Sequence, residues 1–419
     1  MKKWQRWGVF PFSIIGIAVI IIMINFITQP PPSSPHILPH IMIAQLTGKG
    51  AINDSAAYDV KGTDLGIPVK YQGQMRFLFG DTFGGDFTYW SNPNGNNDTH
   101  WRSNTMAYST DTNASDGITI DGWVTNSSSG LARELIPSLK NDVEVTCIPT
   151  TAVTDGTNFY IYYMSVRHWG DPGKWDCNNA SIAVSTDGET FTKVSNVTWA
   201  GGSPENMFGL VQNTTAGGLP AEDLYFLATP SGRFGNAYCV TVAKSQILNQ
   251  SAYRYYLGTD LAGNLLWGRD PWSVQAVIPG PIGELSAMWD GYLQKFVVMY
   301  LESNLGMIVL RTADRPWGPW SAPIGIVDST EYPGLYGGFL HPDLVDNGGQ
   351  EVYFIMSIWG KYNTFVLRAD LISLKGNLIQ SQIIFQYSPF LLVNWNSANF
   401  KWFKSKVWNK ERKLSETIA

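Results

Sequence analysis

The sequence repeats one pattern of short strands five times between residues 75 and 369. Each unit has an apolar and aromatic strand, a short loop, and a second strand that ends in a small or polar residue. The first strands are expected at Met75–Phe79, Phe159–Met164, Leu224–Ala228, Phe296–Leu301 and Val352–Ser357. The second strands are expected at Thr105–Ser109, Ile182–Ser185, Tyr238–Ala243, Met307–Arg311 and Thr364–Ala369. A repeat of this kind excludes most folds that are not built from short, equivalent strand units.

Turn residues and composition support an all-β fold. Asp-Gly pairs at residues 155–156, 187–188 and 290–291 are typical of tight turns between strands. Aromatic residues make up 13% of the chain and charged residues only 15%, which excludes a disordered chain or a coiled coil. With an outer strand in each unit, such as Phe191–Val194, the pattern predicts a five-bladed β-propeller. A β-sandwich is the alternative, but it would need about seven strands in about 100 residues.

The N-terminal region has the pattern of a membrane anchor. Residues 7–27 carry no charge and follow Lys2, Lys3 and Arg6 in the first six residues. About 20 apolar residues span a bilayer as a helix, and preceding positive charges keep the N-terminus in the cytosol. We therefore expect a cytosolic N-terminus at 1–6, a transmembrane helix at 7–27 and a Pro/Ser-rich stalk at 28–45. The propeller is expected at 46–399, followed by a basic tail at 400–419.

This arrangement predicts a single-pass membrane protein with its propeller outside the cytosol. Cleavage of the segment as a signal peptide is the alternative, and it would give a secreted protein. Eight Asn-x-Ser/Thr sequons, beginning at Asn53, agree with an exported glycoprotein. The chain has a net charge of −5, and the basic ends leave the body acidic, which argues against a nucleic-acid partner. No feature of the sequence indicates an oligomeric state.

The three cysteines allow at most one internal disulfide. Cys147 and Cys177 flank one proposed blade and are the expected pair, and three buried thiols are the alternative. No Cys/His spacing resembles a zinc site, so no metal is expected. We expect no cofactor; a structural calcium ion in the central channel is the alternative, although no ligand motif supports it.

Two acidic residues beside glycines are the leading candidates for catalysis. Asp64 opens the innermost strand of a blade within Gly62–Pro68, and Asp81 ends the next strand within Phe77–Asp86. Glycoside hydrolysis needs one protonated carboxyl group for the leaving oxygen and one ionised carboxylate as base or nucleophile. Mutual repulsion and an apolar wall would separate their pKa values. The alternative is that both residues cap turns.

Further polar and aromatic residues are expected at the same end of the propeller. Glu205 is a reserve acid, and Glu284, Tyr336 and His341 are expected to bind substrate where inner strands begin. Aromatic faces stack on sugar rings, while arginine and histidine bind hydroxyl groups. The long loops supply the remaining substrate-binding candidates, which are Trp90, Trp101, Arg102, His168 and Trp169. A packed rim without a ligand is the alternative.

Several motifs in order resemble the domain-of-unknown-function 4185 family. These are Thr63–Pro68, Phe79–Phe83, Arg102–Asn104, Ser203–Met207, Trp317–Ser321 and Tyr336–Pro342. The resemblance covers about residues 46–395 and implies the fold of five-bladed propeller glycosidases. Characterised members form glycoside hydrolase family 183, which is endo-acting on D-arabinofuranose polymers. Asp64 and Asp81 match the two essential acidic positions of that family, whereas Glu205 and His341 match positions without an assigned role.

Together these features predict an exported glycoside hydrolase that acts on a furanose-containing polysaccharide. By resemblance the substrate is D-arabinan, and the partners are this glycan and the membrane. A surface propeller that binds a glycan without cutting it is one alternative. A propeller glycosidase for a different sugar is another.

Overall fold

Within the residues that the structure describes, the protein folds into antiparallel sheets with almost no helix, which confirms the all-β prediction. A computed structural model describes residues 37–87 and 100–376. Strands such as β17 (Lys295–Glu302) and β21 (Glu351–Ile358) are buried at almost every position between their ends. A strand covered on both faces reads as a continuous apolar run rather than an alternating one. This is why the repeated apolar and aromatic segments stand out in the sequence.

The strands form four sheets, one of which is ten-stranded, and this sheet divides at the short parallel contact of its two halves, which gives five groups that follow the chain. Group 1 contains β2 (Gly62–Tyr71), β3 (Gln74–Phe83), β4 (Thr105–Ser109) and β5 (Gly122–Trp123). Group 2 contains β6 (Thr146–Thr154), β7 (Phe159–Trp169), β8 (Trp175–Ser185) and β9 (Thr192–Ala200). Group 3 contains β10 (Met207–Gln212), β11 (Asp223–Thr229), β12 (Gly235–Ala243), β13 (Arg254–Thr259), β14 (Leu265–Gly268) and β15 (Ala276–Ile282).

Groups 4 and 5 complete the set. Group 4 contains β16 (Leu285–Asp290), β17, β18 (Met307–Ala313) and β19 (Ile324–Asp328). Group 5 contains β20 (Leu335–Asp346), β21, β22 (Asn363–Asp370) and the early strand β1 (His40–Gln45). Short 3-10 helices lie between strands at Ser55–Tyr58, Thr215–Gly217, Lys244–Gln246, Gln250–Ala252, Pro271–Ser273 and Asn347–Gly349.

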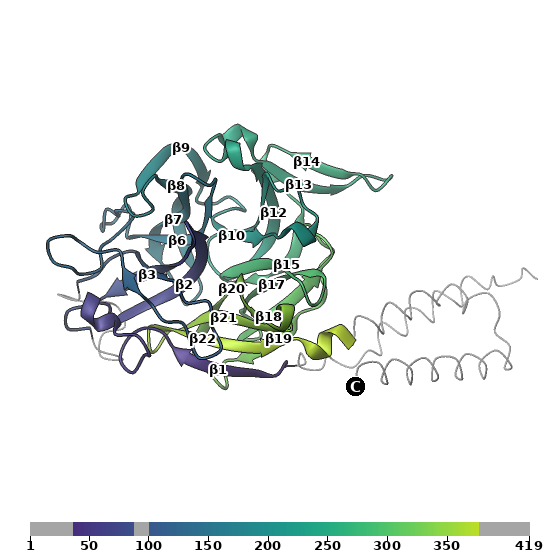
Figure 1. Ribbon diagram of the computed structural model, residues 1–419. Helices are drawn as coiled ribbons and strands as arrows, with labels where there is room; N and C mark the ends of the chain where they lie inside the picture. Colours follow the sequence, from purple (N-terminus) through teal and green to yellow (C-terminus); the bar gives the residue numbers. More distant parts are fainter. Residues whose placement is uncertain (1–36, 88–99, 377–419) are drawn as a thin grey trace, which may run out of the picture.

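In each group one strand precedes the apolar strand that the repeat predicted, and from here on this preceding strand is called the first strand of its group. The first strands of the five groups contact one another in a cycle. β2 contacts β6, β6 contacts β10, β10 contacts β16, β16 contacts β20, and β20 contacts β2. β10 and β16 also pair in parallel over two residues, at Val211–Ala287 and Gln212–Met288. Figure 1 shows the groups around a common centre, with β1 beside β22. Each group therefore contributes the strand that precedes its apolar run to this set of contacts.

One predicted boundary differs from the structure. The Pro/Ser-rich stalk was expected to reach residue 45, but His40–Gln45 forms β1 and pairs with β22. The sheet begins earlier because the apolar and β-branched residues of this segment form an edge strand. The predicted segments 1–6 and 7–27 and the tail 400–419 lie outside the described residues.

The predicted localisation requires correction. In the two described ranges, the structure contains no helix with the length and apolar character needed to cross a membrane. This finding stands against the predicted single-pass localisation, and nothing in the described residues supports the membrane as a partner. The prediction depended on residues 7–27, which are not among the residues described.

The predicted disulfide is wrong. Cys147 in β6 pairs in register with Ser165, and Cys177 in β8 pairs with Val166, so β7 lies between the two cysteines. Two strand spacings are about 9–10 Å, beyond the Cα separation of about 7 Å that a disulfide can bridge. Both residues are buried free thiols, as is Cys239. Burial raises the pKa of Cys147 and of Cys177 to about 12.

Candidate active site

A cavity of about 760 Å³ opens where the first strands begin. All five groups contribute to it, through Asp64 of β2, Ile148 of β6, Met207 of β10, Leu285 of β16 and Tyr336 of β20. In several groups the turn between the second and third strands of the group supplies much of the rest of the cavity wall. A cavity of this size is in the range of small-molecule binding sites.

Asp64 lies at a double irregularity in the pairing of β2 with β3. Thr63 pairs with Thr82 and Leu65 with Phe79, so two residues of β3 oppose Asp64 alone. At the next pair the extra residue lies on β2 instead: Gly66 stands between Leu65 and Ile67, whose partners on β3 are adjacent residues. Leu65 and Gly66 have positive φ angles of 68° and 75°. A non-glycine residue in this region is strained, and bulges near active sites redirect side chains.

The environment of Asp64 favours its protonated form. Its Oδ2 accepts a hydrogen bond from the Tyr336 hydroxyl at 2.8 Å, whereas its buried Oδ1 has no hydrogen-bond partner. Burial, and then the charge of Asp81, raise the pKa of Asp64 to about 7. The hydrogen bond from Tyr336 opposes this shift because it stabilises the ionised carboxylate. Asp64 can therefore hold a proton near neutral pH.

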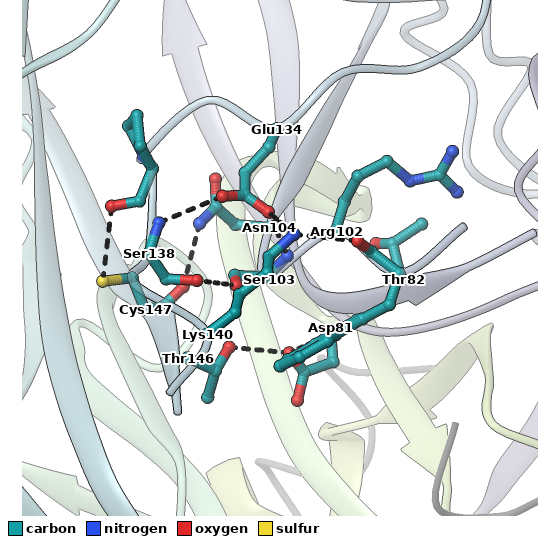
Figure 2. A network of polar contacts seen from close by, with 12 residues as sticks. Asp81, Thr82, Arg102, Ser103, Asn104, Glu134, Ser138, Lys140, Thr146 and Cys147 are labelled. Atoms are coloured by element: carbon teal, nitrogen blue, oxygen red, sulfur yellow. Dashed lines mark hydrogen bonds and ion pairs between the residues drawn. The ribbon is translucent and has the colours of Figure 1, made fainter. Parts of the chain in front are cut away.

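Asp81 is supported as a carboxylate. Its Oδ1 accepts hydrogen bonds from the Thr146 hydroxyl at 2.7 Å and from the Trp101 indole N–H at 2.8 Å. Figure 2 shows the bond from Thr146 beside the polar network of Glu134 and Ser138. Burial raises the pKa of Asp81 to about 6, and the two donors oppose that shift. Asp81 thus ionises at lower pH than Asp64.

An ion pair next to Asp64 was not predicted. Arg233 Nη2 donates to Glu284 Oε1 at 2.7 Å, and the guanidinium lies 4.7 Å from the centre of the Tyr336 ring. Arg233 follows the second strand of group 3, the position that Asp81 occupies at the end of the second strand of group 1. Tyr362 occupies the equivalent turn in group 5 and also lines the cavity. That shared topological position was the available signal for both residues.

Four of the predicted substrate-binding residues line the cavity. These are Trp101, Trp169, Glu284 and Tyr336. Trp169 is 43% exposed, so its ring is available to a ligand. Trp90 lies outside the described residues. The other predicted residues do not line the cavity.

Arg102 and His168 serve other contacts. The buried Arg102 donates to the Asp59 backbone carbonyl and side chain, and Figure 2 shows it extending away from Asp81. His168 pairs in register with Asp176 on the exposed end of β7. Neither residue lines the cavity, because neighbours in sequence of a cavity residue need not share its direction.

His341 and Glu205 are buried outside the cavity lining. His341 Nδ1 accepts a hydrogen bond from the Asp343 backbone N–H, and burial lowers its pKa to about 4, so the ring is neutral. Burial raises the pKa of Glu205 to about 8, and neither carboxylate oxygen has a hydrogen-bond partner. A reserve acid must reach substrate, so the structure does not support that role for Glu205.

No metal centre is evident within the described part of the chain. Nowhere in it do three or more His, Cys, Asp or Glu side chains gather closely enough to hold a metal ion. The described arrangement instead offers two carboxyl groups of different proton affinity in one cavity. Such a pair is suited to acid–base chemistry.

Trp101→Phe and Tyr336→Phe are expected to move opposite limbs of a pH–activity profile. If activity needs ionised Asp81 and protonated Asp64, it falls below a pKa of about 6 and above a pKa of about 7. Removing the Trp101 donor destabilises ionised Asp81, so its pKa rises and the acidic limb of the profile moves to higher pH by about one unit. Removing the Tyr336 donor raises the pKa of Asp64 and moves the alkaline limb to higher pH instead. Profiles of kcat/KM against pH test this, and movement of the same limb in both variants would contradict it.

Comparison with known proteins gives a family and a fold. A family model described as Domain of unknown function (DUF4185) matches residues 50–368. The chain is 27% identical over 328 residues to the Notoamide biosynthesis cluster protein J of Aspergillus sp. (strain MF297-2), covering 72% of this chain and 80% of that protein.

Two solved structures are similar to this chain at lower sequence identity. A crystal structure of a Bacteroides ovatus protein, provisionally named a hydrolase, aligns with a TM-score of 0.53 at 12% identity, over 74% of this chain and 86% of that one. At this identity the similarity establishes a related fold alone. A glycosyl hydrolase of Bacteroides ovatus aligns with a TM-score of 0.43 at 12% identity, over 82% of this chain and 93% of that one.

Proposed function

The chain belongs to the family described as Domain of unknown function (DUF4185), and we propose that it is a glycoside hydrolase with a five-bladed propeller fold. The cyclic contacts of β2, β6, β10, β16 and β20 support the propeller. The observation that carries the enzymatic proposal is that Asp64 and Asp81 line one cavity and have pKa values raised to different extents.

The two carboxyl groups take different roles. Asp64, with the higher pKa, donates a proton to the glycosidic oxygen that leaves. Asp81, whose ionised form is stabilised by Thr146 and Trp101, acts either as a nucleophile on the anomeric carbon or as a base on the attacking water. The Arg233–Glu284 pair lies beside Tyr336 and contributes a fixed polar surface for the sugar ring.

The proposed substrate is a furanose-containing glycan, with D-arabinan as the first candidate. This choice rests on the resemblance to the family, which implies that Asp64 and Asp81 match its essential acidic positions. The relative from Aspergillus is named for a biosynthesis cluster. A smaller glycoside is therefore included among the substrates to be tested.

Digestion of D-arabinan tests the function. We expect the wild-type protein to release oligosaccharides and Asp81→Asn to lower the rate by about a thousandfold. Asp290→Asn is the matched control, since Asp290 is also buried with a pKa raised to about 6 but lines a separate cavity of about 210 Å³. The control should retain activity. Equal rates for wild type and Asp81→Asn would refute the assignment.

Two alternatives give different results in the same assay. A non-catalytic glycan-binding propeller would bind oligosaccharides and release none, with or without Asp81. A glycosidase for another sugar would cut a different member of a glycoside panel and would still depend on Asp64 and Asp81.

A further inference from the structure

Two polar groups in the lining of the cavity have no role in the chemistry of the two carboxyl groups. They are the indole Nε1 of Trp175 and the hydroxyl group of Thr229, whose side chains are buried at 7% and 1% exposure. Neither atom has a hydrogen-bond partner among the described residues. Burying an indole N–H or a hydroxyl group without a partner costs free energy, so its retention calls for an explanation. A ligand that supplies the missing partners is such an explanation.

These two residues lie on turns that contact each other. Thr229 ends β11 of group 3, and Trp175 begins β8 of group 2. Shortly after Thr229, the Arg233 backbone N–H donates to the Gly173 carbonyl at 2.8 Å. The Arg233 guanidinium also lies 5.6 Å from the centre of the Trp175 ring. Trp175 and Thr229 therefore belong to one part of the cavity wall.

This part of the wall is suited to a sugar ring. The exposed Trp169 ring meets Trp175 edge to face, with the ring centroids 5.6 Å apart. Asp171 and Lys174, in the same turn, add exposed polar groups to the cavity lining. A sugar can stack on an aromatic face, while its hydroxyl groups both donate and accept hydrogen bonds. They can therefore accept from the Trp175 N–H and bond to the Thr229 hydroxyl in either sense.

The neighbours of this wall identify which sugar binds there. Arg233, beside Trp175, also lies 4.7 Å from the centre of the Tyr336 ring, and the Tyr336 hydroxyl donates to Asp64. The hydrogen-bond donors to Asp81 are other residues. In glycoside hydrolysis the acid lies on the side of the leaving group, and the other carboxylate acts at the opposite face of the sugar ring. The sugar beside Trp175 is therefore the one that leaves.

We propose that Trp175 and Thr229 form a binding subsite for the leaving sugar, with its ring against Trp169. This inference rests on the proposed glycoside hydrolysis and makes a second sugar, rather than a simple alcohol, the preferred leaving group. The bond between the anomeric carbon and the glycosidic oxygen breaks, and that oxygen takes the proton of Asp64 and becomes a hydroxyl group of the departing sugar. Water supplies the hydroxyl group of the anomeric carbon, and its remaining proton returns to the carboxyl pair.

Thr229→Val tests the subsite with two substrates that differ in the leaving group. These are a disaccharide of D-arabinofuranose and methyl D-arabinofuranoside, each as both anomers. We expect kcat/KM for the disaccharide to fall by about fivefold, because a sugar hydroxyl group loses its partner, and kcat/KM for the methyl glycoside to stay unchanged. Equal losses with both substrates, or no loss with the disaccharide, would overturn the subsite. Turnover that depends on Asp81 would then leave the proposed function intact.

Trp175→Phe removes the other unpartnered group. Phenylalanine keeps an aromatic ring beside Arg233 but has no N–H to donate, so the same selective loss with the disaccharide is expected. If Trp175→Phe and Thr229→Val both fold and retain the preference for the disaccharide, the proposal is contradicted.

Thermal unfolding gives a readout that a structural role would change in the opposite direction. Thr229→Val removes a buried hydroxyl group without a partner, so Tm should stay unchanged or rise. Thr47→Val is the matched control, because Thr47 is 0% exposed and does not line the cavity, but its hydroxyl donates to Asn363 Oδ1 at 3.1 Å. The control should have a lower Tm and an unchanged preference for the disaccharide. A comparable fall in Tm for Thr229→Val would mean that its hydroxyl has a structural role, and would overturn the proposal.

Binding separates the subsite from the chemistry. By calorimetry, the Kd of the disaccharide should be about fivefold lower for Asp81→Asn than for the double variant Asp81→Asn/Thr229→Val. This difference without turnover by the wild-type protein would support the sugar site and refute the proposed function. Equal Kd values, or no binding of the disaccharide, would overturn the subsite.

Discussion

Replacing Asp64 by asparagine is expected to lower hydrolysis of alkyl glycosides by about a thousandfold, while glycosides of nitrophenol lose far less. An alkoxide is a poor leaving group and needs the proton that Asp64 supplies at a pKa of about 7. A nitrophenolate leaves without protonation. The dependence of rate on the leaving group therefore identifies the acid, which a simple loss of activity would not.

Asp81→Asn serves as the contrasting variant. Asp81 acts on the anomeric carbon or on water, so its loss should slow alkyl and nitrophenyl glycosides alike. Steady-state kinetics with both substrates would provide the comparison. If Asp64→Asn lost activity equally with both leaving groups, Asp64 would not be the acid.

The sequence predicted these two residues for a physical reason. Asp64 stands two residues before Gly66 and Asp81 directly follows Gly80, on consecutive strands of one hairpin, so local spacing was enough to bring them together. The repeated apolar strands were equally local and predicted the all-β fold. Tight turns and buried central strands leave a signal within a few residues.

The remainder of the site depends on contacts between distant groups. Arg233 reaches Glu284 and Tyr336 from a different sheet group, and neither local spacing nor charge distinguishes it from other arginines. The predicted residues that do not line the cavity have the same explanation. Arg102 immediately follows the cavity residue Trp101, but its guanidinium is directed to Asp59. The direction of a side chain at a strand end is set by packing against other parts of the molecule, and sequence spacing does not encode that packing.

The bulge at Asp64 is a further feature that could not be predicted. Leu65 has a φ of 68°, a conformation unfavourable for a branched apolar residue, and its N–H donates to the Ser357 hydroxyl at 2.9 Å. That hydrogen bond comes from group 5 and helps to hold the strained residue. The position of Asp64 is therefore maintained by more than one sheet group.

Gly80→Ala should lower activity by about a hundredfold through displacement of Asp64. A Cβ atom at residue 80 would clash with Asp64 Oδ1 and lie 3.2 Å from Leu65 Cδ1. The carboxyl group must move away, and small displacements of a catalytic group reduce rates strongly. Gly202→Ala is the control, because a Cβ atom there meets nothing within 4 Å and no positive φ opposes the change.

A double variant separates displacement of Asp64 from general damage. If Gly80→Ala acts through Asp64, its loss should be greatest with alkyl leaving groups, as for Asp64→Asn. The double variant Asp64→Asn/Gly80→Ala should then be no slower than Asp64→Asn alone, because the function of Asp64 is already absent. Additive losses would mean that residue 80 affects the site by another route. Overpacking costs about 1–3 kcal/mol of stability, so thermal unfolding must accompany the kinetics to confirm that each variant remains folded.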